Sequence, residues 1–349
     1  MAVNWWLMKR VPGKNVRIAT AAAIAVSAAG VAAGNRFAGP CRGRSGMRSN
    51  CGPLFLPADS DAINREIPMV NLFPNDSYDT PPGRRTFLSR ILFNSRLYFY
   101  SKTYYNFYRI GRCAGRGRFD RDRQSYYSGL NVRILESCGA RIHLRGLNHL
   151  SDTPGPFVIV ANHQSSVETA ILNAVISPRL DFTFVIKRSL FSVPFFGAAM
   201  RAIDAIGVDR VNPREDFKEV MRAGQELLKE GRSVLIFPES TRQREFLPER
   251  FNTIGLKLAK SAGVRIIPLA LKTDFLEPGA LIPEFGSLHR SRHIHLEFGE
   301  PLDASGNGRE AHRQILDFIA ERTAHWNLAE RRAPCASAGL NGFRPAPVS

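Results

Sequence analysis

His163 and Glu168, near the middle of the 349-residue chain, have the types and the spacing that suit acid–base chemistry. An imidazole whose one nitrogen is held by a carboxylate keeps a fixed tautomer and offers its other nitrogen as a base. Five residues of one helix turn the chain by about 500°, so on a helix the two side chains would point apart. They can meet only if His163 lies in a turn and Glu168 reaches back from the first helical turn after it.

The residues around this pair predict such a turn. The continuous apolar run Phe157–Ala161 is typical of a strand that is buried on both faces. Ser165 or Ser166 can cap the helix that follows, which we expect over about 166–176. His163 would then lie at the carboxyl end of a strand, where open α/β sheets bind their ligands. The pair alone is equally compatible with a surface histidine and a glutamate favoured by a helix N-terminus.

Three other predicted strands also end in polar residues. These residues are Lys187 and Arg188, Asp209 and Arg210, and 239–242. The carboxyl ends of strands in a doubly wound sheet gather at one crevice, so we expect a base, a carboxylate and several cations there. Arginine forms bidentate contacts with phosphate. The set therefore suits a phosphate-bearing substrate with a hydroxyl group to be activated.

The elements that must position these residues alternate between strand and helix from about residue 140 onward. This alternation favours an α/β fold, a layered and mostly parallel sheet flanked by helices. The expected strands are 140–145, 157–161, 182–186, 206–208, 233–237, 265–272 and 293–298. A closing helix is expected over 310–324. We place the compact domain at 131–326 and expect a disordered tail over 327–349.

The formal charge of +17 indicates an anionic partner: nucleic acid, an anionic membrane surface or a phosphorylated substrate. Residues 1–84 form a basic extension, in which 35–84 has the composition of a disordered linker. Within it, the weakly apolar stretch 18–34 suits a signal-type segment, a marginal anchor or a low-complexity extension. The five cysteines show no paired spacing, which predicts free thiols in a cytosol-facing protein.

Residues 85–130 are rich in aromatic and basic side chains. Within this segment, 87–110 interleaves the two kinds at loosely helical spacing, as a helix lying in a membrane interface does. The alternatives are a helix packed on the domain with its basic residues in water, and a groove that stacks single-stranded nucleic acid. We expect the membrane interface, and therefore a membrane-associated protein.

Four blocks in order resemble the PlsC-like glycerolipid acyltransferases, particularly those acting on lysophosphatidic acid and related lysophospholipids. NHQSSVE at 162–168 resembles their first block, whose core is NHxxxxD, and GVDR at 207–210 resembles the end of the second. FPESTR at 237–242 is similar to the usual FPEGTR, and IIPLAL at 266–271 to the apolar fourth block with its central Pro268. The resemblance covers about 140–300 and implies a glycerol-3-phosphate acyltransferase-like fold with an N-terminal membrane-associating helical segment.

The resemblance also implies a reaction. His163 would take the proton from a lysolipid hydroxyl, and Glu168 would orient the imidazole. The activated oxygen would attack the thioester of acyl-CoA or acyl carrier protein, without a bound cofactor or metal. With 1-acyl-glycerol-3-phosphate as acceptor, the product would be phosphatidic acid. There are two alternatives: the acceptor is another lysolipid, or the protein is a non-catalytic membrane-binding relative. The implied substrate-binding residues are Asn162, Lys187, Arg210, Glu239, Ser240, Thr241 and Arg242.

Two residues depart from the family's pattern. Glu168 replaces the usual aspartate and is one methylene longer, so its distance to the imidazole must be set by a different backbone position or rotamer. Ser240 replaces the usual glycine, which excludes a glycine-only φ at this position or implies a changed loop.

Other chemistries receive less support from the residues. A serine hydrolase using Ser165 or Ser166 would need a G-x-S-x-G elbow, which the sequence lacks. The sequence contains no helix-turn-helix, RRM or zinc pattern of a nucleic-acid-binding module, so we expect no nucleic-acid partner. His293 and His295 share a strand face and could hold a metal, but no third ligand is evident, which favours a structural role.

Overall fold

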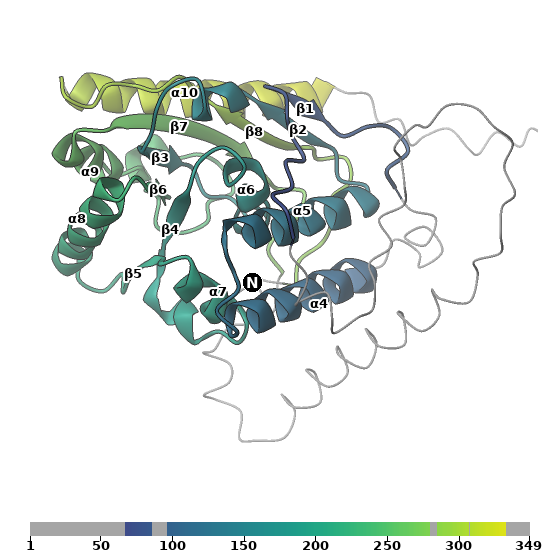
Figure 1. Cartoon of the computed structure of the whole chain (residues 1–349). Helices are drawn as coiled ribbons and strands as arrows, with labels where there is room; N and C mark the ends of the chain where they lie inside the picture. The colour runs from purple at the N-terminus through teal and green to yellow at the C-terminus, as the bar shows by residue number, and fades with distance from the viewer. Residues whose placement is uncertain (1–66, 86–95, 280–284, 307, 333–349) are drawn as a thin grey trace, which may run out of the picture.

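The computed structural model describes residues 67–85, 96–279, 285–306 and 308–332, and a mixed eight-stranded sheet lies at the centre of this part (Figure 1). The strands are β1 (Tyr78–Asp79), β2 (Ile142–Arg145), β3 (Phe157–Ala161), β4 (Phe182–Lys187), β5 (Ile206–Val208), β6 (Ser233–Ile236), β7 (Arg265–Lys272) and β8 (Ile294–Phe298). Their order across the sheet is β1-β2-β8-β7-β3-β6-β4-β5. Neighbours are parallel except for β1–β2 and β7–β8, so the expected mostly parallel sheet is confirmed, with two antiparallel pairs on one side.

Helices cover both faces of the sheet. They are α4 (Arg96–Ala114), α5 (Arg121–Ser137), α6 (Val167–Ile176), α7 (Phe196–Ala202), α8 (Pro213–Lys229), α9 (Ile254–Ala262) and α10 (Gly308–Arg332). Figure 1 shows α8, α9 and α10 on one side of the sheet and α4, α5 and α6 on the other. In the central strand β3, Phe157 and Ile159 belong to the apolar cluster on the α4–α7 side, whereas Val158 and Val160 belong to the α8–α10 side. This two-sided burial explains why β3 is apolar throughout.

The ends of the folded region differ from the sequence prediction. Helix α10 continues to Arg332, past the expected end at residue 324 and into the expected tail, because Trp326 is buried against the sheet. Part of the expected linker is also folded: Phe73 is buried, and Tyr78–Asp79 forms the edge strand β1. The apolar stretch 18–34, the rest of the extension up to residue 66 and residues 333–349 lie outside the described residues.

The aromatic and basic segment contains two helices, α4 and α5. Residues 86–95 of this segment lie outside the described part. In α4, Phe99 and Ile110 are buried against the domain, and the buried Arg109 lies over the ring of Tyr127 at 5.3 Å. Basic side chains of α4 therefore do not all face water. Among the helices of the described residues, none has the length and hydropathy needed to cross a bilayer.

Candidate active site

The predicted turn between strand and helix is confirmed. Strand β3 ends at Ala161 and helix α6 begins at Val167, so His163 lies in the connection and Glu168 in the first turn of α6. The carboxylate reaches back, and its Oε2 lies 2.5 Å from Nδ1 of His163. The glutamate side chain is fully buried, whereas 15% of the histidine side chain is exposed. The longer side chain of glutamate therefore makes the contact from this position on the helix.

Three further donors hold the carboxylate of Glu168. Its Oε1 accepts the backbone N–H groups of Gln164 and Ser165, each at 2.8 Å, and the hydroxyl of Thr273 at 2.5 Å. The bond to Ser165 is the half of a capping box that a glutamate supplies at a helix N-terminus. A buried carboxylate is tolerated when such donors replace its water. The Glu168 side chain thus caps α6, holds the backbone of the turn and fixes the orientation of the imidazole.

The arrangement determines which nitrogen of His163 is free. Because the carboxylate accepts from Nδ1–H, the lone pair of the neutral ring is on Nε2. The ring stacks on Phe237, with centroids 4.4 Å apart. Packing and the carboxylate together fix the orientation of the imidazole, so Nε2 can act as a general base.

Thr273 was not predicted, although a signal for it exists. It directly follows β7, which runs parallel to β3, so it emerges at the same edge of the sheet as His163. Polar residues that directly follow a strand are candidates for the site, and this criterion also applies to Thr273.

The side chain of Asn162 is bonded to the backbone of a neighbouring strand, which we did not expect for a substrate-binding residue. Its side-chain amide donates to the carbonyl of Leu271 and accepts from the N–H of Leu271, both at 2.8 Å. The side chain is buried and extends the pairing between β3 and β7 by one step. Asn162 therefore positions the turn that carries His163.

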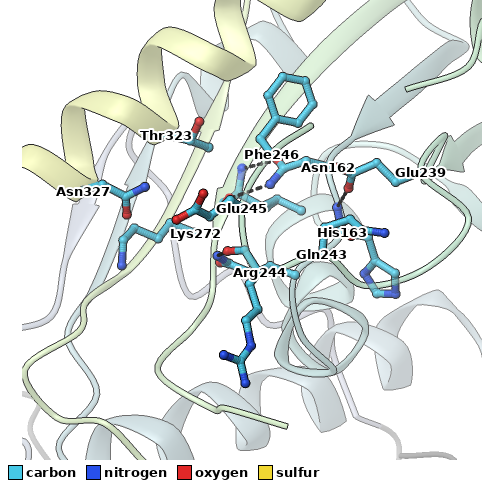
Figure 2. A pocket seen from close by; sticks show the side chains of 12 residues that line it. Asn162, His163, Glu239, Gln243, Arg244, Glu245, Phe246, Lys272, Thr323 and Asn327 are labelled. Atoms are coloured by element: carbon cyan, nitrogen blue, oxygen red, sulfur yellow. Dashed lines mark hydrogen bonds between the residues drawn. The ribbon is translucent and has the colours of Figure 1, made fainter. Parts of the chain in front are cut away.

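The loop after β6 is bonded to the same turn. Glu239 accepts the backbone N–H of His163 at 2.6 Å, and the N–H of Gln243 donates to the carbonyl of His163 at 2.8 Å. Gln164 adds a bond from its side-chain amide to the carbonyl of Arg244, also at 2.8 Å. Figure 2 shows His163, Glu239, Gln243 and Arg244 in this region, with the imidazole of His163 directed away from Lys272. The resemblance implies that Glu239 binds the phosphate, but in the structure its carboxylate holds the backbone N–H of His163.

Burial raises the pKa of Glu239 to about 7, although the N–H donors of His163 and Leu247 oppose this shift. The negative charge of Glu168 raises it further. A folded-state pKa above the usual 4.5 means that the folded protein binds this proton more tightly. The resulting stabilisation is fully present below pH 4.5 and is lost as the pH rises through about 7.

We expect Glu239→Gln to flatten the pH dependence of stability between about pH 5 and 8. Glutamine keeps an oxygen that can accept the His163 N–H and carries no charge. As the pH rises across this range, the free energy of unfolding of the wild type should fall by about 1–2 kcal/mol relative to that of the variant, after allowance for solvent screening. Urea unfolding of both proteins at several pH values measures this difference. Parallel stability curves would contradict the assignment.

Arg210 follows β5 and Arg242 lies in the loop after β6, two strands that end at the same edge of the sheet with β4 between them. Partial removal from water lowers the pKa of Arg210; Asp216 opposes this shift, and the positive charge of Arg242 adds to it. The backbone N–H groups of Asp209 and Arg210 both donate to the carboxylate of Asp216, at 2.8 and 2.7 Å. Guanidinium groups suit bidentate contacts with phosphate oxygens. Lys187 ends β4 at the same edge, opposite Val208 in the β4–β5 register, and is exposed.

The loop residues Ser240 and Thr241 are exposed next to Arg242. Ser240 has a φ of 61°, so the position does adopt the left-handed conformation that favours glycine. Our expectation that serine excludes this conformation is wrong. The strain costs about 1 kcal/mol, which the bonds between this loop and the His163 turn can offset.

Ser165 is part of the helix start. Its hydroxyl accepts the N–H of Val167 at 3.2 Å, and its own N–H is bound by Glu168. The side chain is buried. These contacts assign it a capping role and do not favour a nucleophilic serine.

A cleft of about 480 Å³ opens beside the turn, and Gln164 and Arg242 are among its lining residues. It therefore reaches both the turn that carries His163 and the arginine in the loop after β6. Its lining includes side chains of both charges, among them Arg244, Glu245 and Arg331.

The chain is similar in sequence to known proteins. A family model described as Acyltransferase matches residues 141–272. The 1-acyl-sn-glycerol-3-phosphate acyltransferase of Pseudomonas aeruginosa is 35% identical over 192 residues, which cover 55% of this chain and 70% of that protein. A chloroplastic 1-acyl-sn-glycerol-3-phosphate acyltransferase of Arabidopsis thaliana is 31% identical over 131 residues, 38% of this chain and 36% of that protein.

The fold has a counterpart among solved structures. The crystal structure of the 1-acyl-sn-glycerophosphate (LPA) acyltransferase PlsC from Thermotoga maritima matches with a TM-score of 0.51 and 20% identity. The match covers 69% of this chain and 97% of that one.

Proposed function

The chain belongs to the acyltransferase family that includes the 1-acyl-sn-glycerol-3-phosphate acyltransferases, and from this we propose its reaction. It transfers an acyl chain from a thioester to the free hydroxyl of a lysophospholipid. The acceptor is 1-acyl-glycerol-3-phosphate, and the product is phosphatidic acid. The observation that carries the proposal is the His163–Glu168 pair, with Nδ1 bound to the buried carboxylate and Nε2 available as a base.

The proposed chemistry is a single displacement. Nε2 of His163 takes the hydroxyl proton as the acceptor oxygen attacks the thioester carbonyl. The tetrahedral intermediate collapses, the carbon–sulfur bond breaks, and the imidazolium returns its proton to the leaving thiolate. Glu168 stabilises the imidazolium while it exists. The donor is acyl-CoA or acyl carrier protein, and the residues need no bound cofactor.

The head group is proposed to bind at the arginine pair. Arg210 and Arg242 contact the phosphate, and Lys187 adds positive charge at the same edge. Ser240 and Thr241 are exposed beside them and can donate hydroxyl hydrogen bonds. Asn162 and Glu239 act through the backbone around His163 and do not touch the substrate.

We expect Arg242→Ala to raise KM for lysophosphatidic acid, because one charge-assisted bond to the phosphate is lost. A bond of this kind contributes about 1.5–3 kcal/mol, which corresponds to a loss of about 10–100-fold in kcat/KM. Arg313→Ala is the control, since Arg313 is an exposed arginine of α10 paired with Glu310. Steady-state kinetics with varied acceptor measures the effect. Equal KM values for the two variants would remove Arg242 from the head-group site.

The proposed partner surface is an anionic membrane on the cytoplasmic side. Leu97 and Tyr108 of α4 and Phe195 before α7 are 69%, 39% and 43% exposed. The rings of Tyr108 and Phe195 are 5.3 Å apart, and Arg112 is stacked over Tyr108. Exposed aromatic and aliphatic groups next to arginine suit a membrane interface.

One assay tests the function as a whole. Purified protein is incubated with lysolipids of several head groups and with acyl-CoA or acyl carrier protein as donor. We expect phosphatidic acid from lysophosphatidic acid with at least one donor. Binding to anionic liposomes without acyl transfer to any lysolipid would instead indicate a non-catalytic membrane-binding relative.

A further inference from the structure

Three histidines come together on the sheet face that α10 covers. In the parallel pair β2–β8, His143 lies opposite His295, and His293 directly precedes β8. Alternate strand residues share a face, so all three imidazoles project to the same side. The sequence analysis found no third ligand for His293 and His295. The register of the sheet brings His143 to them from 150 residues away.

The nitrogens of these residues have the spacing of ligands to one ion. Nε2 of His143 is 3.0 Å from Nδ1 of His293, and one nitrogen from each of the three residues lies within 4.8 Å of the others. Two nitrogens that bind one Zn²⁺ tetrahedrally are about 3.3 Å apart, given Zn–N bonds of about 2.0–2.1 Å. The spacing of the three nitrogens therefore departs from that of ligands to one ion by about 1.5 Å at most.

A carboxylate orients the first of these histidines. Oδ1 of Asp79, in the edge strand β1, lies 2.5 Å from Nδ1 of His143. Arg145 holds the same carboxylate through bonds of 2.9 and 3.0 Å. Histidines that bind metals usually donate their other ring N–H to such a carboxylate, which fixes the tautomer and raises the basicity of the ligand. The contact leaves Nε2 of His143 directed at His293.

The surroundings of the cluster are partly closed. All three histidines are half-buried, and Trp326 of α10 stacks on His295 with centroids 4.9 Å apart. The rings lie nearly parallel, His143 making angles of 23° with His293 and 18° with His295. A shared ion therefore requires the rings of His293 and His295 to rotate about Cβ–Cγ while His143 keeps its contact with Asp79, and the bond between His143 and His293 is exchanged for metal bonds.

The charges near the cluster are balanced. Lys272, the neighbour of His295 on β7, is bonded to Asp274 at 2.6 Å and to Glu330 at 2.8 Å. These two carboxylates offset the positive charge of Lys272 beside His295.

We propose that His143, His293 and His295 bind one divalent transition-metal ion, with Zn²⁺ as the simplest candidate and Asp79 as the outer partner of His143. Imidazole ligands favour zinc, copper, nickel and cobalt, whereas Mg²⁺ and Ca²⁺ prefer oxygen. The ion joins β2 to β8 and, through Asp79, to β1. This site is structural and does not depend on the proposed acyl transfer.

Metal stoichiometry tests the proposal. The full chain is incubated with Zn²⁺, desalted and analysed for zinc and protein. We expect about one equivalent of zinc in the wild type and in His325→Ala, which removes an exposed histidine of α10, and a loss of this zinc in the double variant His143→Ala/His295→Ala. Asp79→Asn should weaken zinc binding by about 10–100-fold. An excess of Mg²⁺ should not displace the ion.

A second measurement needs no variant. X-ray absorption of the Zn²⁺-loaded wild type should show about three imidazole nitrogens around the metal. Less than about a tenth of an equivalent in the wild type would overturn the proposal. Unchanged zinc in a folded double variant, or sulfur as the main ligand, would also overturn it, because the ion would then be held elsewhere. None of these results depends on enzyme activity.

Discussion

Replacement of His163 by alanine is expected to lower kcat for acyl transfer by about 10²–10⁴-fold, the contribution of a positioned general base. The fold should persist, because Glu168 keeps three donors from Gln164, Ser165 and Thr273. The lost hydrogen bond and the lost stacking on Phe237 should cost about 1–3 kcal/mol. Initial rates at saturating lysophosphatidic acid, with thermal unfolding of the same samples, measure both effects.

A matched variant separates loss of the base from loss of any histidine. His325 is exposed on α10, so His325→Ala should keep the wild-type rate. If His163→Ala turned over near the wild-type rate, the base would have to be a different residue.

The central part of the site could be predicted because its signals are local. Strand β3 is covered on both faces, so its apolar run is continuous, and the run ends where the chain reaches the polar edge of the sheet. His163 and Glu168 are five residues apart, and the geometry of one turn and one helix start decides whether they meet. The parallel order of the strands then brings the ends of β4, β5 and β6 to the same edge.

The supporting contacts could not be predicted, because they join residues that are distant in the chain. Asn162 pairs with Leu271, 109 residues away, and Glu239 binds the N–H of His163, 76 residues away. A sequence shows that such residues are polar. It does not show whether their side chains will form hydrogen bonds with a distant backbone group. The family resemblance therefore implies a substrate-binding role for both residues, whereas the structure shows them bonded to backbone groups.

The borders of the fold were missed for a related reason. Residues 67–85 have no hydrophobic period, yet Tyr78–Asp79 pairs with β2 and Phe73 fills the core. At the other end, the last turns of α10 are fixed by Trp326 on His295 and by Glu330, which accepts the N–H of His293. Only the assembled sheet provides these partners.

Glu168→Gln is expected to lower kcat by about 10²–10⁴-fold although it changes the shape of the side chain very little. The site of Oε1 receives three donors, so the amide oxygen must occupy it. The amide NH₂ then faces Nδ1 of His163 and donates to it. This places the ring proton on Nε2, and the neutral imidazole can no longer accept a proton there. The variant thus keeps the histidine but holds it in the wrong tautomer.

Two companions make this test specific to Glu168. Thr273→Val removes one of the four donors but keeps the charge and the bond to His163, so its rate should fall by less than about tenfold. Glu168→Asp keeps the charge but is one methylene shorter, and its rate should lie between those of the other two variants. Nitrogen NMR of the His163 ring reports the tautomer directly. A wild-type tautomer in Glu168→Gln, or equal losses in Glu168→Gln and Thr273→Val, would mean that Glu168 only stabilises the turn.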